Sequence, residues 1–303
     1  MSWKNLTLAI VAGDAREQEI AHCAVQAGAS VRAFGFPWPE AGIEGVYHAR
    51  DAADALRGAD IALFPIPGIA PDGGLFAPAL SERIIPSVGM LSGMTANGHI
   101  ILGWADENLR SACATLGISL HEYEWDVDLM LLRGPAIVEG VLKVIIENTR
   151  ITIHKANICL VGQGTIGGLL TRTLVGLGAH VTVAARNPVQ RASAYAMGAE
   201  SCELDALPDL LASMDIIIGT VPKQLIGADL LNTVKLEALL VDVAAPPGTI
   251  DRDTAGQMGL RAIWARGMGA RAPVTVGRSQ WTGIRRRVED ILAAASATPQ
   301  VPT

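Results

Sequence analysis

The sequence contains few cysteines and histidines, and none of them are grouped as metal ligands. Its 303 residues include 4 cysteines and 6 histidines. The histidines are scattered singly, and Cys23, Cys113, Cys159 and Cys202 do not stand at the short spacings of a zinc site. This pattern argues against a metal centre and against a disulfide framework. It is typical of small apolar core residues in a reducing compartment.

Basic charge and long apolar runs are also missing. The chain has 24 Lys and Arg against 30 Asp and Glu, a net charge of −6, so it lacks the basic stripe that neutralises phosphates of nucleic acids. No uncharged apolar run reaches the ~18 residues of a membrane span. Leu6–Ala12 is too short for a signal peptide and leads directly into a turn. We therefore expect a cytoplasmic protein that binds neither nucleic acid nor membrane.

What the chain does have is apolar material arranged in short runs. Half of its residues are hydrophobic, 18% are charged and 32 are glycine. Runs such as Leu6–Ala12, Ser30–Phe34 and Ile61–Pro65 predict buried strands, and helical patterns alternate with them. In the same region we predict a helix over Leu75–Ser81 and a strand over Ile85–Met90. Strands alternating with helices predict an α/β fold with parallel sheets.

The strand–helix pattern restarts after an apolar-periodic segment at Val138–Thr149, which predicts a long helix between two Rossmann-like domains. We expect a flavodoxin- or Rossmann-like substrate domain over residues 1–137 and a dinucleotide-binding domain over 138–280, with a cleft between them. Residues 281–303 are expected to form a C-terminal helix, at Arg285–Ala295, and a frayed tail.

A glycine-rich turn lies between an apolar strand and an apolar helix of the second domain. It reads Gly162-Gln163-Gly164-Thr165-Ile166-Gly167, the G-x-G-x-x-G pattern. The first glycine permits a tight turn, the second lets the backbone approach a pyrophosphate, and the third lets helix and strand pack closely. The helix N-terminus presents free N–H groups to the phosphates. The cofactor-binding residues predicted here are Gly162, Gly164, Thr165, Ile166 and Gly167.

The end of the next strand selects the cofactor. His180–Ala184 is followed by Ala185-Arg186-Asn187-Pro188, without the Asp or Glu that NAD enzymes use to bind the ribose hydroxyls. Arg186 and Asn187 can donate hydrogen bonds to a 2′-phosphate, and Arg191 in the next helix can assist them. An acid would repel that phosphate, whereas an arginine pairs with it. We therefore predict NADP as the cofactor.

Loops at the later strand ends are expected to complete the dinucleotide site. Thr220, Val221 and Pro222 are predicted to line the adenosine or pyrophosphate side. The loop from Asp242 through Ala244 is predicted to approach the nicotinamide, which makes Asp242 a candidate catalytic residue. The Pro and Gly residues of these loops are also compatible with simple turn chemistry.

In these motifs the chain resembles the A subunit of dipicolinate synthase, an enzyme of sporulating bacteria. The similarity runs in order along nearly the whole sequence and includes a Gly-Asp-x-Arg turn after the first strand. The segments that carry it are Val11–Arg16, Phe64–Gly68, Ser92-Gly93, Val138–Gly140, Thr149–His154, Gly162–Gly167, Ala185-Arg186, Thr220–Pro222, Asp242–Ala244 and Pro247-Gly248.

The resemblance implies an NADP-dependent oxidation of 4-hydroxy-tetrahydrodipicolinate to pyridine-2,6-dicarboxylate, with the B subunit of dipicolinate synthase as partner. The substrate is a small dicarboxylate, which arginines bind through two parallel hydrogen bonds. Arg16 and Arg271 are the candidate substrate ligands, together with Asp14 and Ser92, and Glu139 is the candidate general base. A homo-oligomer is expected from the fold class.

Three departures from the family pattern stand near the expected substrate site. Ala245 and Pro246 replace a serine and a polar residue, Ala136-Ile137 replaces Pro-Thr, and residues 266–270 replace a Pro-Gly-Leu-Pro-Gly loop. They leave two alternatives open. One is an NADP-dependent dehydrogenase of another small carboxylate, and the other is a nucleotide-binding protein without catalysis.

The candidate side chains also have structural interpretations. Arg16 is compatible with a surface ion pair, and Asp14 and Glu139 are compatible with acids that stabilise helix N-termini. Asp242, at a strand end, is compatible with fixing a loop.

Overall fold

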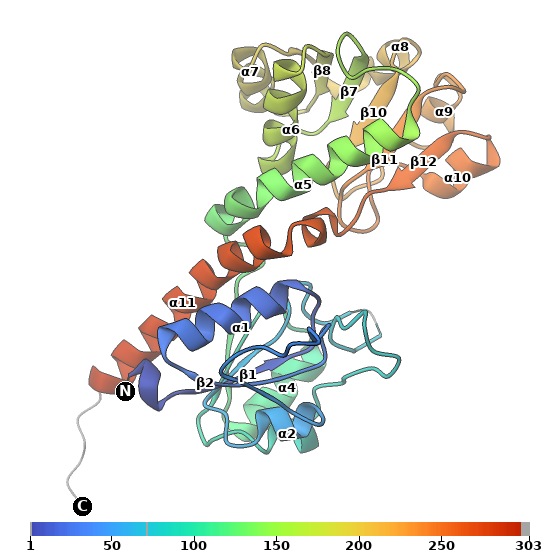
Figure 1. Ribbon diagram of the computed structural model, residues 1–303. Helices are drawn as coiled ribbons and strands as arrows, with labels where there is room; N and C mark the ends of the chain where they lie inside the picture. Colours follow the sequence, from blue (N-terminus) through green and yellow to red (C-terminus); the bar gives the residue numbers. More distant parts are fainter. Residues whose placement is uncertain (1, 71, 298–303) are drawn as a thin grey trace, which may run out of the picture. The chain divides into compact units, whose positions relative to one another are not determined.

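The computed structural model describes residues 2–70 and 72–297. The chain forms two compact units, of which the first combines Met1–Arg133 with Ala272–Thr303 and the second comprises Gly134–Arg271. Each unit contains one six-stranded sheet, and all strand pairings in both sheets are parallel (Figure 1). The prediction of an α/β fold with two Rossmann-like parallel sheets is confirmed.

The units divide the chain differently from the expected segments 1–137, 138–280 and 281–303. The boundary falls between Arg133 and Gly134, inside helix α5 (Val127–Asn148). Helix α11 (Pro273–Ala297) is longer than expected and belongs to the first unit. An amphipathic pattern shows that a helix has an apolar partner but not which sheet provides it, so the sequence could not reveal this return. The expected tail at 298–303 lies outside the described residues.

The sheet of the first unit has the strand order β3-β2-β1-β4-β5-β6. Its strands are β1 (Thr7–Val11), β2 (Ser30–Phe34), β3 (Val46–His48), β4 (Ile61–Leu63), β5 (His99–Leu102) and β6 (Ser119–Glu122). In the register, Leu8 of β1 lies between Val31 of β2 and Ile61 of β4. The chain winds from β1 outward to β3 and then returns to β4 on the other side of β1. Ligands of such sheets bind at the carboxyl ends of the strands where this reversal occurs.

Strand β1 supplies side chains to both faces of this sheet, because successive residues of a strand point to opposite sides. Leu8 and Ile10 pack in the core that contains α1 (Arg16–Ala27) and α11. Ala9 and Val11 pack in the core on the opposite face, which is covered by α2 (Ala52–Leu56), α3 (Val88–Leu91) and α4 (Glu107–Leu116). Helix α11 runs alongside α1 (Figure 1).

Residues 75–91 differ from the expected structure. The predicted helix at Leu75–Ser81 is irregular, and the predicted strand at Ile85–Met90 is replaced by the end of a loop and the short helix α3. Leu75 and Ile84 are buried in the core and joined by one backbone hydrogen bond of 2.8 Å. An apolar pattern reports burial, and here it marks a loop that covers the core, not a strand or helix.

The second unit repeats the same winding, with strand order β12-β11-β10-β7-β8-β9. Its strands are β7 (Asn157–Val161), β8 (His180–Ala184), β9 (Glu200–Cys202), β10 (Ile216–Gly219), β11 (Leu239–Asp242) and β12 (Arg261–Trp264). One face is covered by α5, α6 (Thr165–Gly176) and α7 (Pro188–Ala196). The other face is covered by α8 (Leu207–Leu211), α9 (Ala228–Leu231) and α10 (Arg252–Gln257). Short 3₁₀ helices lie at η1 (Trp3–Asn5), η2 (Leu204–Ala206) and η3 (Met268–Arg271).

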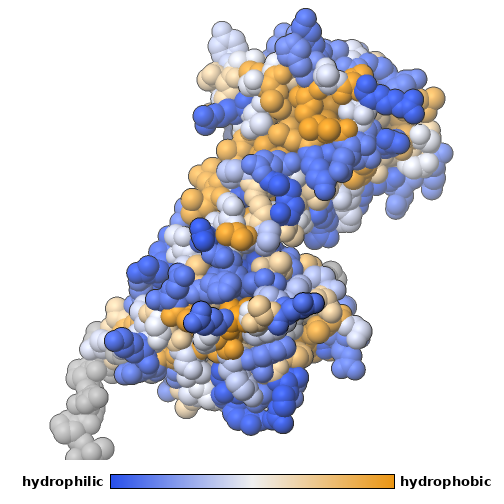
Figure 2. All heavy atoms as spheres, viewed as in Figure 1, coloured by the Kyte–Doolittle hydropathy of each residue, from blue (hydrophilic) through white to orange (hydrophobic). Residues whose placement is uncertain are grey.

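The structure also bears on membrane-spanning helices, metal ligands and hydrophobic surface. Within residues 2–70 and 72–297, no helix combines the length and the apolar character that a membrane crossing requires. In the same ranges, no three His, Cys, Asp or Glu side chains gather as metal ligands. The visible face is mostly hydrophilic, with hydrophobic patches on each unit (Figure 2).

Candidate functional site

Three glycines shape the turn between β7 and α6, and each is required for a different reason. Gly162 has a φ of 99°, and a side chain there would collide with Thr220 and Val221. A Cβ at Gly167 would collide with the carbonyl oxygen of Gly162, so the helix approaches the turn more closely than any other residue allows. At Gly164, no atom lies within 4 Å of the position that a Cβ would take. The space beside Gly164 is therefore open to a ligand.

The first turn of α6 leaves backbone donors unpaired. The amides of Thr165, Ile166 and Gly167 have no acceptor in the part of the chain that the structure describes, and Gly164 has no side chain to cap them. The first backbone bond at this helix end runs from Gly168 to Gly164, at 2.8 Å. Unpaired amides and the positive end of the helix dipole together bind phosphate groups. The turn and helix thus fit the pyrophosphate of a dinucleotide.

Thr220 fixes the glycine turn from the neighbouring strand end. Its hydroxyl lies 3.0 Å from the carbonyl oxygen of Val161 and 3.2 Å from that of Gly162, and donates to them. The next residue, Val221, donates its N–H to Thr249 Oγ1 at 2.9 Å and accepts from the same hydroxyl at 2.7 Å. The structure therefore places Thr220 and Val221 beside the glycine turn, and the exposed Pro222 follows them.

Asp242, the expected catalytic residue, anchors a loop. Its side chain is fully buried, and Oδ1 accepts from the Ala244 N–H at 3.0 Å. Oδ2 accepts from the N–H groups of Thr249 and Ile250, at 2.7 Å and 2.9 Å, and lies 3.4 Å from Nη1 of Arg252. A carboxylate with both oxygens engaged and no exposed surface closes the loop after β11. This geometry matches the loop-fixing interpretation, and it leaves no oxygen free for catalysis.

The end of β8 carries the residues that were expected to choose the cofactor. Asn187 Oδ1 accepts from the Val189 N–H at 2.8 Å and caps α7. Arg191 donates to the carbonyl oxygens of Ala185 and Arg186, at 2.8 Å and 2.9 Å, and also pairs with an exposed glutamate. The exposed side chain of Arg186 has no hydrogen bond or ion pair with any described residue. Of the three, Arg186 has no side-chain partner among the described residues, Asn187 uses only its oxygen, and Arg191 uses both of its terminal nitrogens.

Glu139 of α5 and Arg271 of η3 form an ion pair within the second unit. The segment before Arg271 packs against α5, since a Cβ at Gly140 would collide with Met268. The Glu139 side chain is 61% exposed and that of Arg271 is 39% exposed, so both remain accessible to solvent. The expected base and one expected substrate ligand are therefore partners of each other.

The Gly-Asp-x-Arg turn of the first unit lies at the carboxyl end of β1. Arg16 donates from Nε and Nη2 to the two carboxylate oxygens of Asp14, at 2.8 Å and 3.0 Å, although it is only 8% exposed. The remaining nitrogen, Nη1, has no partner among residues 2–70 and 72–297. Burial opposes the charge of Arg16, but its hydrogen bonds to the Asp14 carboxylate and the charges of Glu17 and Asp14 raise its pKa above the usual value. Arg16 is a buried, permanently charged group and not a plain surface arginine.

Glu17, which the sequence did not single out, is buried beside this pair. It is 3% exposed, its Oε2 accepts from the Asp14 N–H at 2.7 Å, and its Oε1 has no partner within the described residues. Burial raises the pKa of Glu17 to about 7, against the lowering effect of Arg16. A glutamate in the first turn of a helix is ordinary in a sequence, because the dipole favours it there. Only burial distinguishes this one.

Ser92 does not join Asp14 and Arg16. It ends α3, and its hydroxyl donates to the carbonyl of Gly89 at 2.9 Å. The carbonyl of the adjacent Gly93 accepts from the Gly58 N–H at 2.8 Å, in the turn that enters β4. In a parallel sheet this turn lies at the amino edge, whereas Asp14 and Arg16 follow β1 at the carboxyl edge. The structure therefore does not bring Ser92 together with the other substrate ligands expected in the first unit.

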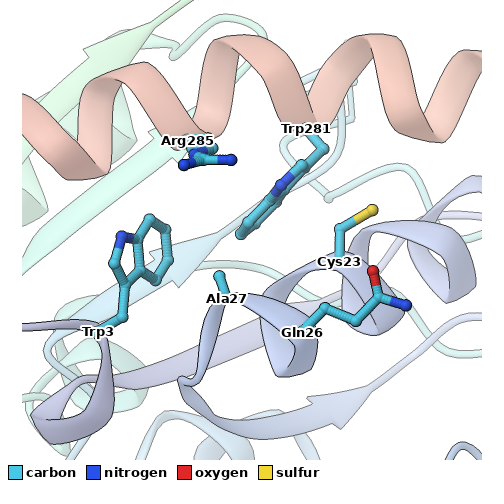
Figure 3. Close-up of a pocket in the computed structure, with 6 residues that line it drawn as sticks. All are labelled: Trp3, Cys23, Gln26, Ala27, Trp281 and Arg285. Carbon is cyan, nitrogen blue, oxygen red and sulfur yellow. The ribbon is translucent and has the colours of Figure 1, made fainter.

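The first unit also has a hollow of about 450 Å³ between α1 and α11 (Figure 3). The ring centroids of Trp3 and Trp281 are 5.6 Å apart in it, and Arg285 is held by Glu289 at 2.7 Å. The hollow lies at the C-terminal half of α1, away from the Gly-Asp-x-Arg turn at the start of that helix. Its lining residues are Trp3, Cys23, Gln26, Ala27, Trp281 and Arg285.

The two sheets and the glycine turn define a class, the two-unit α/β proteins with a dinucleotide-binding dehydrogenase domain. Residues 144–253 match the family model of the D-isomer specific 2-hydroxyacid dehydrogenase, NAD binding domain. Residues 7–124 match the model of the N-terminal domain of the dipicolinate synthase A subunit. The second unit is therefore an oxidoreductase domain for a nicotinamide cofactor.

The chain is similar to whole proteins over both of its units. The chain is 26% identical over 274 residues to the dipicolinate synthase A subunit of Bacillus subtilis (strain 168), covering 90% of this chain and 92% of that protein. Its fold matches the crystal structure of the dipicolinate synthase A subunit from Bacillus subtilis with a TM-score of 0.83 at 25% identity, over 95% of this chain and 97% of that one. It matches the A subunit from Bacillus halodurans with a TM-score of 0.84 at 25% identity, over 99% and 100% of the two chains. The chain is thus similar to dipicolinate synthase A subunits along both of its units.

Proposed function

We propose that this protein oxidises 4-hydroxy-tetrahydrodipicolinate to pyridine-2,6-dicarboxylate with NADP. The observation that carries the proposal is the similarity to the dipicolinate synthase A subunit in both units, over 90% of the chain. The conversion removes one water, one hydride and one proton from the substrate. The nicotinamide ring supplies the hydride acceptor when the cofactor is bound.

NADP is preferred to NAD in this proposal because of Arg186. Its guanidinium is exposed and unpaired at the end of β8, where an NAD enzyme has an acid for the ribose hydroxyls. The amides of Thr165 and Ile166 and the open space at Gly164 hold the pyrophosphate. Thr220, Val221 and Pro222 are assigned to the lining of the site, and the loop through Ala244, which Asp242 anchors, is assigned to the nicotinamide side.

Substrate carboxylates are assigned to the arginines of each unit. Arg16 is held in place by Asp14 and keeps Nη1 for a ligand. Arg271 is accessible, and when it turns to a carboxylate it releases Glu139 to accept the proton of the reaction. Asp242 acts by positioning its loop.

The family also suggests where and with what this chain works. We propose that it acts in the cytoplasm of a sporulating cell, that it assembles with the B subunit of dipicolinate synthase, and that it forms a homo-oligomer. The Bacillus subtilis relative is named as one lettered subunit of its enzyme, which supports the existence of a partner subunit.

A second candidate is an NADP-dependent dehydrogenase of another small carboxylate. It is favoured by Ala245 and Pro246, which are exposed on the loop after β11 and offer no polar side chain to a substrate. The two candidates are separated by one assay. The protein is incubated with NADP and enzymatically generated 4-hydroxy-tetrahydrodipicolinate, with and without the B subunit, and the absorbance of pyridine-2,6-dicarboxylate is followed. Formation of that product supports the first function, and NADPH formation only with other carboxylates supports the second.

A further inference from the structure

The buried charges near the end of β1 balance only when Glu17 is neutral. Arg16 is paired with Asp14 through two hydrogen bonds. Arg133 is paired with Glu124 in the same way, at 3.0 Å and 3.2 Å. Each arginine thus has its own carboxylate, whereas the buried Glu17 has no cation of its own. An ionised Glu17 would place two carboxylates against the single charge of Arg16.

Among residues 2–70 and 72–297, no neighbouring element supplies the missing cation. Tyr123, after β6, is buried, and its pKa is raised first by burial and then by Glu17, so it stays neutral. Arg278 of α11 is engaged by Glu19 at 2.6 Å. The charged and titratable groups around Glu17 are therefore Asp14 and Arg16 from its own turn, Tyr123 and Glu124 after β6, Arg133 of α5, and the Glu19–Arg278 pair.

The free oxygen of Glu17 points to a function for this arrangement. Oε2 is used by the Asp14 N–H, whereas Oε1 is buried without a partner in the described chain, a costly state unless another group completes it. Gly13 lets the carboxyl group lie directly against the turn, since a Cβ there would collide with Glu17. The backbone is thus shaped to hold this acid at the carboxyl end of β1, where ligands of such sheets bind.

We propose that Glu17 is a positioning residue that sets the affinity of Arg16 for a small dicarboxylate. When Glu17 is neutral, the Arg16 charge is shared between Asp14 and the carboxylate of the ligand. When Glu17 is ionised, it competes with the ligand for the same guanidinium and repels it. This inference rests on the proposed function, in which Arg16 binds the substrate. It adds Glu17 as the group that regulates binding by Arg16.

Thermodynamic linkage makes the effect reciprocal. If ionisation of Glu17 weakens dicarboxylate binding by some factor, the bound dicarboxylate must lower the acid dissociation constant of Glu17 by the same factor, so its pKa rises by the logarithm of that factor. A carboxylate a few ångströms from another in a partly buried site interacts by enough for a change of about tenfold. The expected coupling is therefore about one pH unit in the titration of Glu17.

The first test follows the carboxyl carbon of Glu17 by nuclear magnetic resonance. The full chain is labelled with ¹³C-glutamate and titrated with and without saturating pyridine-2,6-dicarboxylate, and the Glu17 signal is assigned by through-bond experiments. We expect a midpoint near 7 that rises by about one unit with the ligand. A midpoint near the ordinary value of 4.5, or one that the bound ligand leaves unchanged, overturns the proposal. This measurement uses the native chain and does not depend on the folding of a substituted variant.

The second test measures the affinity for pyridine-2,6-dicarboxylate by calorimetry at pH 6 and pH 8. We expect the native chain to bind about tenfold more weakly at pH 8, and Glu17→Gln to bind equally at both pH values. Glu107→Gln is the matched control, because Glu107 stands in the first turn of α4 but is exposed, and it should behave like the native chain. Equal affinities of the native chain at both pH values contradict the coupling. If the native chain does not bind the ligand at either pH, the substrate role of Arg16 fails, and a Glu17 midpoint near 7 then shows that its burial was described correctly.

Discussion

Arg271 forms an ion pair with Glu139, so that η3 and α5 are joined by the two side chains assigned to substrate binding and to proton transfer. While the pair is closed, the two side chains assigned to these tasks are occupied by each other. A substrate carboxylate that takes the place of Glu139 would satisfy Arg271 and free the base in one exchange. The partial exposure of both side chains leaves room for this exchange.

Replacing Arg271 by alanine should weaken substrate binding without changing the stability of the fold. Loss of a charge-assisted carboxylate pair costs ~2–3 kcal/mol, so we expect kcat/KM for the carboxylate substrate to fall about a hundredfold. An exposed pair contributes only about 0–1 kcal/mol to folding, so the unfolding free energy should change little. Steady-state kinetics and urea unfolding of Arg271→Ala decide this. Native kinetics in the variant would mean that the pair only joins η3 to α5.

Gly164→Val should abolish dinucleotide binding without unfolding the chain. Its position has an extended backbone and open space around the missing Cβ, so valine is tolerated locally but occupies the room needed by the pyrophosphate. Gly167→Val is the contrasting variant, since its side chain would meet the carbonyl of Gly162, and we expect it to unfold at lower temperature. Fluorescence titration with NADPH and thermal unfolding test both variants. Native NADPH affinity in Gly164→Val is the result that removes this turn from the cofactor site.

Arg186→Asp should reverse the preference between the two dinucleotides. The native chain is expected to bind NADPH more tightly than NADH, because the unpaired guanidinium faces a 2′-phosphate that aspartate would repel. Arg172→Asp on α6 makes the same change of charge at another exposed arginine and should leave the preference as it is. Calorimetric titrations with both dinucleotides provide the comparison. Tighter binding of NADH by the native chain would show that the cofactor is NAD.

Asp242→Ala should destabilise the second unit. The substitution leaves the buried N–H groups of Thr249 and Ile250 without their acceptor, which costs about 1–3 kcal/mol for each unpaired group. Because Thr249 also holds Val221, we expect weaker NADPH binding in the same variant. Urea unfolding and an NADPH titration measure the two effects. A variant of native stability that lacks only turnover would restore Asp242 as a catalytic residue.

Glu17 should make stability fall as the pH rises. Its folded pKa of about 7 lies above its ordinary value of 4.5, so the folded chain binds more protons than the unfolded chain between these values. The stabilisation is complete below the unfolded pKa and is lost as the pH rises through the folded pKa, by an amount on the order of 3 kcal/mol. We expect Glu17→Gln to lose this dependence and to be more stable than the native chain at pH 8. Urea unfolding of both chains at pH 5 and pH 8 measures this effect. An equal change in unfolding free energy between the two pH values for both chains would contradict the prediction.

The sequence predicts the dinucleotide turn well because its requirements are local. Gly162, Gly164 and Gly167 act through backbone conformation and close approach, and both properties follow from the residue type and its place between a strand and a helix. The parallel sheets are predicted for a similar reason, since buried strands such as β7 and β10 are continuous apolar runs.

The remaining site residues depend on contacts that a sequence does not contain. The apolar run before Ser92 predicts a strand, but the structure has a loop and the short helix α3 there, and Ser92 lies away from Arg16. The burial of Glu17 arises from the packing of α1 and not from a motif, so no local pattern marks it. The pairing of Glu139 with Arg271 joins residues far apart in the chain, and only the fold brings them together.

The return of α11 to the first unit reverses the order in which the two units are completed during synthesis. The core against α1 also contains Trp281, Ile284 and Val288, so this face of the first sheet is only partly covered until helix α11 has left the ribosome. Residues 134–271 emerge in full before then. Domains ordinarily finish folding in the order in which they are made, from the N-terminus. Here the first unit begins folding first and completes its core last. A nascent chain that stops after Arg271 contains the whole second unit, the nucleotide-binding domain, but lacks the part of the first unit that α11 supplies.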